Sequence, residues 1–144
     1  PGFDIIPYGS LHYERAVSLR SEILRKPLGL VFDPEFLAQE KDPAHTHVGA
    51  FAGETLVGCL ILTDVGNALL KMRQVAVAAN QQGRGVGRAL AEFSEKFGRE
   101  NGFREIVLNA RETAVPFYLA LAYISVSETF TEVGIPHRKM RKIL

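Results

Sequence analysis

The sequence contains almost no cysteine and no long apolar run. Its single cysteine, Cys59, cannot form an internal disulfide and fits a reducing compartment, so a cytoplasmic location is expected. No apolar run approaches the ~20 residues that a membrane span needs, and no basic-then-apolar signal segment opens the chain. The formal net charge is only +1, which gives no general reason to expect nucleic acid or a membrane surface as a partner.

Length and composition indicate one globular domain. A chain of 144 residues can bury roughly 68–70% of its unfolded surface, which is enough for a substantial core. The sequence has no internal repeat, no low-complexity tract and no long polar linker. We therefore expect a single domain that spans residues 1–144.

One stretch, residues 74–88 (QVAVAANQQGRGVGR), combines the end of a strand, a glycine-rich turn and the start of a helix. The free N–H groups of a helix's first turn and the positive end of its dipole attract anions. Glycines let the backbone approach a phosphate closely and adopt positive φ angles. Arg84 and Arg88 add cationic side chains with a forked geometry. The stretch is therefore predicted to bind a phosphate group.

The glycine spacing excludes two common phosphate loops. No Gly-Lys-Ser/Thr follows the glycines, so the stretch is not a Walker P-loop. The dinucleotide fingerprint also fails, because Arg88 stands where its third glycine is required. The stretch instead reads Q-x-x-G-x-G, formed by Gln82, Gly85 and Gly87.

Hydrophobic periodicity and turn signals predict the order β–α–β–β–β–α–β–α–β–β. Helices are expected after caps at Ser10 and Thr113 and after the glycine loop, with a short helical turn after Asp33-Pro34. The crossover through the middle helix makes the strands before and after it parallel. The expected strands are 3–8, 46–52, 56–64, 68–77, 103–109, 123–133 and 137–144.

A second motif follows one strand after the glycine loop, in A-V-P-F-Y-L-A-L-A-Y, residues 114–123. Together with Q-x-x-G-x-G, it resembles the GNAT superfamily of acetyl-CoA-dependent N-acetyltransferases, in which this helix often reads A-x-x-F-Y-x-x-x-G-F/Y. Ala122 replaces the usual glycine of that pattern. The matching positions are Ala114, Phe117, Tyr118 and Tyr123.

The resemblance implies the GNAT acyl-CoA N-acyltransferase fold. This is an α/β (α+β) fold with a mixed, mostly antiparallel sheet and a central parallel strand pair flanked by helices. The segment Gly134-Ile135-Pro136-His137 is also similar to the end of a bacterial GNAT subgroup with a C-terminal Gly-Ile-Pro-His segment.

Acetyl-CoA is the cofactor that the resemblance implies. The strand before the glycine loop would offer backbone groups to the pantetheine amides, where a neighbouring strand splays away. The amides of residues 83–88 would hold the pyrophosphate, and Asn109 would touch the pantetheine arm. The implied cofactor-binding residues are Val75, Ala76, Val77, Gln82, Gly83, Arg84, Gly85, Val86, Gly87, Arg88, Asn109, Ala114, Phe117 and Tyr118.

For the chemistry, the resemblance makes Tyr118 the candidate general acid that protonates the departing CoA thiolate. An amine acceptor with a pKa near ~10.4 must lose a proton, so a general base is also expected. Many GNAT enzymes draw a carboxylate from the strand before the loop, but this chain has Lys71, Arg73 and Gln74 there. The remaining candidates are Glu40, Asp64, Glu132 and His137, of which we select Glu132 and His137 with Tyr118 as the catalytic set.

Three other features are expected to be structural. His45 and His47 share one strand face, but no Cys or carboxylate set completes a zinc site, so no metal is expected. Cys59 is expected to be a small buried hydrophobe rather than a nucleophile. The basic run 137–142 is expected to be the solvated face of an edge strand.

The leading hypothesis is an N-acetyltransferase that moves the acetyl group directly to a small-molecule or peptide amine in a ternary complex. A sensor module that binds CoA without turnover, or a nucleotide-binding α/β protein, are the alternatives. A homodimer is one expectation for the assembly, because exposed terminal strands often pair in this fold. The acceptor is expected to contact residues 26–45, the 64–68 turn and the C-terminal hairpin, with partly apolar walls from Phe32, Phe36, Leu37 and Phe130.

Overall fold

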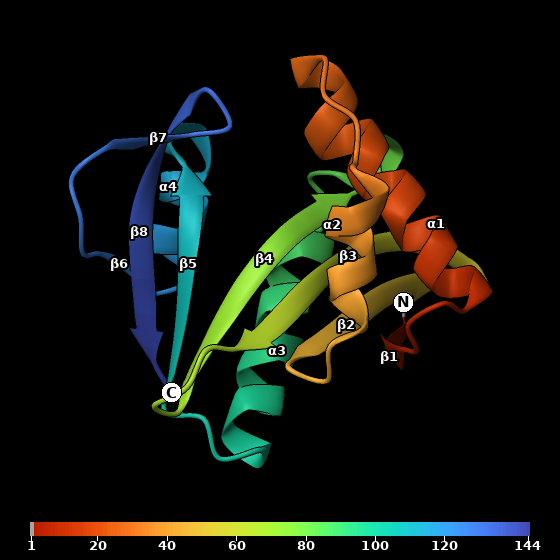
Figure 1. Cartoon of the computed structure of the whole chain (residues 1–144). Helices are drawn as coiled ribbons and strands as arrows, with labels where there is room; N and C mark the ends of the chain where they lie inside the picture. The colour runs from red at the N-terminus through yellow and green to blue at the C-terminus, as the bar shows by residue number, and fades with distance from the viewer. Residues whose placement is uncertain (1) are drawn as a thin grey trace.

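The computed structural model describes residues 2–144 and contains one eight-stranded mixed sheet (Figure 1). The strand order is β1-β2-β3-β4-β5-β8-β6, and β7 also pairs with β8. All paired strands are antiparallel except β4 and β5, which are parallel, so the predicted fold is confirmed. The strands are β1 (Gly2–Ile6), β2 (His45–Ala52), β3 (Thr55–Asp64), β4 (Leu69–Val77), β5 (Glu105–Arg111), β6 (Ile124–Ser125), β7 (Phe130–Glu132) and β8 (Ile135–Ile143).

Helices cover both faces of the sheet. In Figure 1, α1 and α2 lie in front of the half formed by β1 to β4, α3 lies behind that half, and α4 lies behind β5 and β8. The α-helices are α1 (Leu11–Arg20), α2 (Pro34–Ala38), α3 (Val86–Glu100) and α4 (Val115–Ala120). Shorter turns are the π-helix η1 (Ser21–Arg25) and the 3-10 turns η2 (Lys26–Leu28), η3 (Gln39–Lys41), η4 (Ala79–Gln81) and η5 (Glu112–Ala114).

Local capping chemistry fixes the helix starts in the first half of the chain. The Ser10 hydroxyl accepts a hydrogen bond from the Tyr13 N–H at 3.1 Å, and the Asp33 carboxylate accepts one from the Glu35 N–H at 2.9 Å. Both caps satisfy first-turn donors that the helix itself leaves unpaired. The predicted starts of α1 and α2 are therefore confirmed.

The predicted cap at Thr113 is wrong. Residues 112–114 already form the 3-10 turn η5, and Ala114 is the residue that precedes α4, with no side-chain cap. Thr113 therefore has helical backbone geometry. Pro116 lies in the first turn of α4, where its missing N–H reduces the need for a cap.

The predicted strand 123–133 is also wrong, because it divides into β6 and β7. The Ser127 hydroxyl accepts the Lys139 N–H at 2.9 Å, in place of a strand carbonyl. Such side-chain bonding to the backbone competes with a regular ladder. Tyr123 lies before β6 and is buried in the core rather than alternating along a strand.

The last strand is internal, which corrects the expected edge position of residues 137–142. One side of β8 pairs with β5, and the other side pairs with β6 and β7. The chain returns from β7 through a tight turn, so β8 enters the sheet next to β5 instead of outside it. Its cations meet acidic partners on neighbouring elements: Arg138–Glu112, Arg141–Glu105 and Lys142–Glu95.

The core consists of two apolar clusters, one on each side of the sheet. The larger one holds β3, β4 and β5 side chains against α3, whose Val86 and Leu90 are buried, with Phe93 and Phe97 packed against them. This confirms the predicted apolar stripe of that helix. The smaller cluster packs α1 against β1 and β3, and it includes Cys59.

A buried ion pair joins α1 to the segment before β2. The Arg20 guanidinium makes two hydrogen bonds to the Glu40 carboxylate, at 2.8 and 2.6 Å, and the Tyr13 hydroxyl donates a third at 2.7 Å. His47 lies 2.9 Å from the Glu40 carbonyl oxygen. Burial alone would raise the pKa of Glu40, but hydrogen bonds and charge from Arg20 outweigh it and lower the pKa below its usual value.

We predict that Glu40→Gln lowers the free energy of unfolding by about 3–5 kcal/mol, because it leaves the Arg20 charge buried and uncompensated. Urea denaturation measures this. The control is Glu92→Gln, which breaks the exposed pair with Arg88 and should change stability by less than about 1 kcal/mol. Because the folded-state pKa of Glu40 is depressed, the wild-type advantage should be complete above pH ~4.3 and vanish as the pH falls through that lower pKa. Equal losses of unfolding free energy in Glu40→Gln and Glu92→Gln would contradict the stabilising role assigned to the buried ion pair.

Candidate functional site

The two central parallel strands separate halfway along their length. Residues 69–72 of β4 pair with residues 105–108 of β5, and no pairing follows Met72 and Leu108. Figure 1 shows the resulting V between the free ends of β4 and β5. The backbone of β4 beyond Met72 therefore faces β5 without the ladder partner that it has at residues 69–72. This is the splayed strand that the resemblance implied.

A bulge in β4 accompanies the separation. Ile61 of β3 pairs with Arg73 and Cys59 pairs with Ala76, so Gln74 and Val75 together face one residue of β3. Gln74 has a φ of 55°, a left-handed backbone conformation that residues other than glycine rarely adopt.

The extra residue reverses which side chains face which side of the sheet. Leu70 and Met72 belong to the cluster against α3, whereas Ala76 belongs to the cluster against α1. A shift of one residue in a strand always exchanges the two faces. As a result, Ala76 has its side chain in the core, and only its backbone is available to a ligand along β4.

The start of α3 offers an anion site at the end of β4. Gly85 precedes the helix with a φ of 83°, and no side chain caps the first-turn amides. Gly83 has a φ of 76°, and a Cβ at either glycine would meet nothing within 4 Å. The face of the loop is therefore open to a ligand. These observations fit the pyrophosphate of CoA, since uncapped amides at a helix start bind phosphate oxygens.

Some side chains around this loop are free to contact a ligand, and others already have partners within the protein. Arg84 is exposed, and Arg88 bonds Glu92 at 3.2 Å. The Gln82 amide donates to the Val77 carbonyl at 3.1 Å and closes the turn, and Val86 is buried in the core. Phe117 of α4 lies against the helix start, with its ring 3.4 Å from where a Cβ of Gly87 would be.

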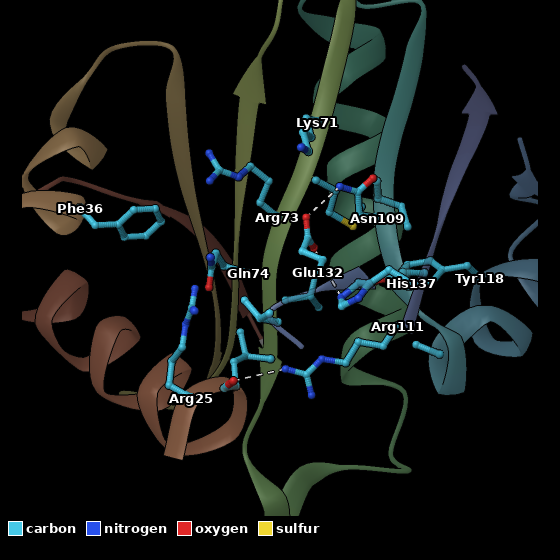
Figure 2. Close-up of a pocket in the computed structure, with 17 residues that line it drawn as sticks. Arg25, Phe36, Lys71, Arg73, Gln74, Asn109, Arg111, Tyr118, Glu132 and His137 are labelled. Carbon is cyan, nitrogen blue, oxygen red and sulfur yellow. Dashed lines mark hydrogen bonds and ion pairs between the residues drawn. The ribbon is translucent and has the colours of Figure 1, made fainter. Parts of the chain in front are cut away.

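A cavity of about 390 Å³ occupies the V between β4 and β5. It is lined by β4, β5 and α4, by η1 and α2 on one side, and by the turn between β7 and β8 on the other (Figure 2). The structure brings six of the predicted site residues to this cavity: Val75, Asn109, Ala114, Tyr118, Glu132 and His137. The predicted phosphate loop does not line it.

Tyr118 lines the cavity, and the rest of its side chain is enclosed by other aromatic rings. Its side chain packs edge-on against Phe117 and Tyr123, with ring centroids 5.0 and 5.6 Å apart, and it is only 7% exposed. Burial raises the pKa of Tyr118 to about 12. Among residues 2–144, its hydroxyl has no hydrogen-bond partner, so the donor is free for a ligand.

Glu132 and His137 of the β7–β8 hairpin form a second group at the cavity. The Glu132 carboxylate accepts a hydrogen bond from the Asn109 amide at 3.2 Å, and its other oxygen lies 3.5 Å from His137 Nε2 (Figure 2). His137 Nδ1 lies 2.9 Å from the Ile135 carbonyl oxygen, which can only accept, so Nδ1 carries a proton. Nε2 is therefore the nitrogen that faces Glu132 and can take up a further proton.

The local sequence explains this pair. Val133 and Gly134 both have positive φ, at 46° and 78°, as in the two-residue turns that suit a hairpin. The turn pairs Glu132 with Ile135 and Phe130 with His137, so Glu132 and His137 share a face of the hairpin. The resemblance implied that Asn109 contacts the pantetheine arm; in the structure its side-chain amide holds Glu132.

The other two base candidates lie outside the cavity. Glu40 is bound by Arg20 and Tyr13, as described above, and is only 5% exposed. Asp64 ends β3 and accepts the Gly66 N–H at 2.9 Å, which is a turn contact. Neither carboxylate is therefore in a position to receive a proton from a molecule in the cavity.

The remaining predicted features have local partners. His45 bonds Thr63 at 2.8 Å and His47 bonds the Glu40 backbone. Within residues 2–144, no group of three or more His, Cys, Asp or Glu side chains could hold a metal ion. Burial raises the pKa of Cys59 to about 12, so this thiol has little thiolate at neutral pH.

The expected acceptor walls are correct only in part. Phe36 of α2 and the β7–β8 turn line the cavity, but the 64–68 turn, Leu37 and Phe130 do not. Phe32 stacks behind Phe36, with ring centroids 6.4 Å apart. Sequence reasoning missed Arg25 and Arg111, which also line the cavity. Strand alternation with Asn109 could have indicated Arg111, whereas no sequence signal marks Arg25.

The chain was compared with known proteins. A family model described as "Acetyltransferase (GNAT) domain" matches residues 21–144. The uncharacterized N-acetyltransferase YjcF of Bacillus subtilis is 29% identical over 128 residues, which cover 88% of this chain and 89% of that protein.

Solved structures have the same fold. A proposed N-acetyltransferase from Lactobacillus plantarum has a TM-score of 0.85 at 23% identity and covers 100% of this chain and 99% of its own. An aminoglycoside 6'-N-acetyltransferase in complex with coenzyme A has a TM-score of 0.81 at 16% identity, with 99% and 97% covered. In the described part of the chain, no helix has the length and apolar character to cross a membrane.

Proposed function

The chain belongs to the GNAT acetyltransferase family, and we propose that it transfers an acetyl group from acetyl-CoA directly to an amine while both are bound. The observation that carries this proposal is the V between β4 and β5. The V places an unpaired edge of β4 and the buried phenol of Tyr118 at one cavity, and the uncapped start of α3 follows just beyond the end of β4. We take residues 1–144 as one acetyltransferase domain. We also assign the chain to the subgroup with a C-terminal Gly-Ile-Pro-His segment, since that segment forms the turn that sets His137 beside Glu132.

In this proposal the backbone supplies most of the cofactor contacts. The unpaired edge of β4 at residues 75–77 would bind the two amides of the pantetheine arm, and the amides of residues 83–88 would bind the pyrophosphate. Arg84 is free to add a charged contact to a phosphate. When bound, acetyl-CoA supplies an activated thioester. Ala114, Phe117 and Tyr118 would then enclose its reactive end from the side of α4.

Tyr118 is proposed to donate its phenolic proton to the leaving sulfur. With a pKa of about 12, the phenol is fully protonated at neutral pH. Against a free thiol of pKa ~8.5 the transfer is uphill by ~3.5 units, or ~5 kcal/mol. The same burial also disfavours a thiolate, which raises the pKa of the thiol and narrows the gap. The pKa of Tyr118 is therefore closer to the pKa of a thiol buried in the cavity than to that of a thiol in water.

Glu132 and His137 are proposed to remove the proton of the amine. A neutral amine with a pKa near ~10.4 costs ~4.6 kcal/mol at pH 7, so the attacking form must be generated in the site. Glu132 attracts the ammonium, and His137 Nε2 is the free acceptor beside it. The pair supplies a base from the β7–β8 hairpin, which compensates for the missing carboxylate in β4.

We predict that Tyr118→Phe lowers the rate of thiol release from acetyl-CoA by about tenfold or more across a panel of amines. Acetyl-CoA affinity should stay within about threefold, since the ring packing is kept. Tyr8→Phe, an exposed tyrosine outside the cavity, is the control. Equal rates for Tyr118→Phe and wild type would remove Tyr118 from the chemistry. Binding of acetyl-CoA by the wild type without release against any amine would favour the CoA-sensor alternative.

We predict that Glu132→Gln lowers turnover at pH 7 by about a hundredfold or more, because the amide keeps the Asn109 contact but attracts no ammonium and takes no proton. The deficit should shrink as the pH rises toward the amine pKa, where free amine becomes abundant. Glu128→Gln, an exposed carboxylate of the β6–β7 loop, serves as the control. A deficit that stays constant with pH would speak against a proton-accepting role.

A further inference from the structure

The cavity contains an excess of positive charge. Four cationic side chains line it, from three elements: Arg25 at the end of η1, Lys71 and Arg73 on β4, and Arg111 at the end of β5. Glu132 is the one carboxylate among the lining residues. Within residues 2–144, none of the four cations forms an ion pair with an acidic side chain.

Three cations of the neighbouring strand β8 are neutralised. Arg138 bonds Glu112 at 3.0 Å, Arg141 bonds Glu105 at 3.4 Å, and Lys142 bonds Glu95 at 2.8 Å. The chain therefore places carboxylates beside these cations of β8 but leaves the cavity cations unpaired. The difference between the paired cations of β8 and the unpaired cations of the cavity indicates that the cavity binds an external anion.

Two of the guanidinium groups are held in place. Arg111 donates a hydrogen bond to the Leu24 carbonyl at 3.3 Å (Figure 2). Arg25 stacks over Phe32, with its guanidinium carbon 4.8 Å from the ring centroid, and its Nε is buried without a hydrogen-bond partner. Its position follows from the widened turn of the π-helix η1, a feature common at functional sites.

The guanidinium groups at the cavity repel one another. Burial lowers the pKa of Arg25, and the nearby charges of Arg20 and Arg111 lower it further, against smaller opposing effects of Glu132 and Glu40. Like charges in a partly desolvated site repel one another. An anion between these groups would relieve the repulsion, and guanidinium forks bind carboxylate and phosphate groups with two hydrogen bonds.

The position of the cations assigns this anion to the acceptor. The phosphate loop lies beyond Val77, at the far end of β4, whereas Lys71 and Arg73 precede the bulge at Gln74. Arg25 and Phe36 come from the segment that covers the other side of the cavity (Figure 2). Glu132 then remains for the ammonium group of the same molecule.

We propose that the acceptor is a small amine that also carries an anionic group, a carboxylate or a phosphate, bound by Arg25, Lys71, Arg73 and Arg111 while Glu132 holds the amine. The assignment of the amine rests on the proposed acetyl transfer. The cavity of about 390 Å³ would hold this small amine together with the reactive end of acetyl-CoA.

Matched acceptors test this proposal. We would compare β-alanine with β-alaninamide, and phosphoethanolamine with ethanolamine, by release of CoA thiol. The anionic member of at least one pair should have a kcat/KM higher by about tenfold or more, and the preferred pair distinguishes carboxylate from phosphate. The amide also has the more readily deprotonated amine, so intrinsic reactivity works against the predicted order. Equal or higher kcat/KM for both neutral members would overturn the proposal.

Variants of the cavity arginines test whether these residues cause the preference for anionic acceptors. Arg111→Gln and Arg73→Gln should each reduce the preference to about threefold or less, with the KM for acetyl-CoA unchanged. The side chain of Arg73 makes no hydrogen bond among residues 2–144, so its variant is expected to fold even if Arg111→Gln does not. Lys139→Gln, an exposed cation of β8 outside the cavity, should keep the full preference. A preference that survives both arginine variants would contradict the proposed site.

Binding without turnover separates the two proposals. Glutarate and inorganic phosphate would be titrated calorimetrically into protein saturated with CoA. Binding that is present in wild type and Lys139→Gln but lost in Arg73→Gln supports the anion site, even if no amine is acetylated and the proposed transfer fails. Binding that CoA abolishes would instead assign these cations to the cofactor phosphates and overturn the proposal.

Discussion

The separation of β4 from β5 is the constraint on which the site depends. Hydrogen bonding between these strands ends at Met72 and Leu108, and the bulge at Gln74 turns the rest of β4 away. Without the separation, the backbone of β4 would bond β5 and would have nothing to offer a ligand. The bulge also exchanges the faces of the strand, so the chain can place Met72 and Ala76 in different clusters. The bulge at Gln74 therefore accounts both for the packing of β4 in the core and for the groove beside it.

Charge divides this groove into two ends with different tasks. At the start of α3, uncapped backbone amides are proposed to bind phosphate with little need of side chains. At the opposite end, the side chains of Arg25, Lys71, Arg73 and Arg111 supply positive charge around Glu132. Tyr118 also lines the cavity, as a protonated phenol whose hydroxyl has no hydrogen-bond partner among residues 2–144. The arrangement suits a thioester that arrives from one end and an amine with its own negative charge from the other.

Local signals in the sequence were enough for most helices and strands and for the open conformation of the glycine loop. Ser10, Asp33 and the apolar stripe of α3 act within a few residues, and the glycines that open the loop at positive φ are visible as such. The misses depend on contacts distant in the chain. Gln74 is not a residue typical of a left-handed conformation, and only pairing with β3 shows its bulge. Likewise, Arg25 and Arg111 meet at one cavity because of tertiary packing, and β8 is internal because of where the last hairpin returns.

The central claim is that the unpaired edge of β4 and the start of α3 together bind acetyl-CoA. Amide hydrogen exchange with and without acetyl-CoA tests it at the level of the backbone. We predict slower exchange at residues 73–77 and 83–88 when acetyl-CoA is present, with the β1–β2 pair unchanged. ATP or NAD at the same concentration should produce no such protection. Unchanged exchange at both segments, with acetyl-CoA at saturating concentration, would contradict the account.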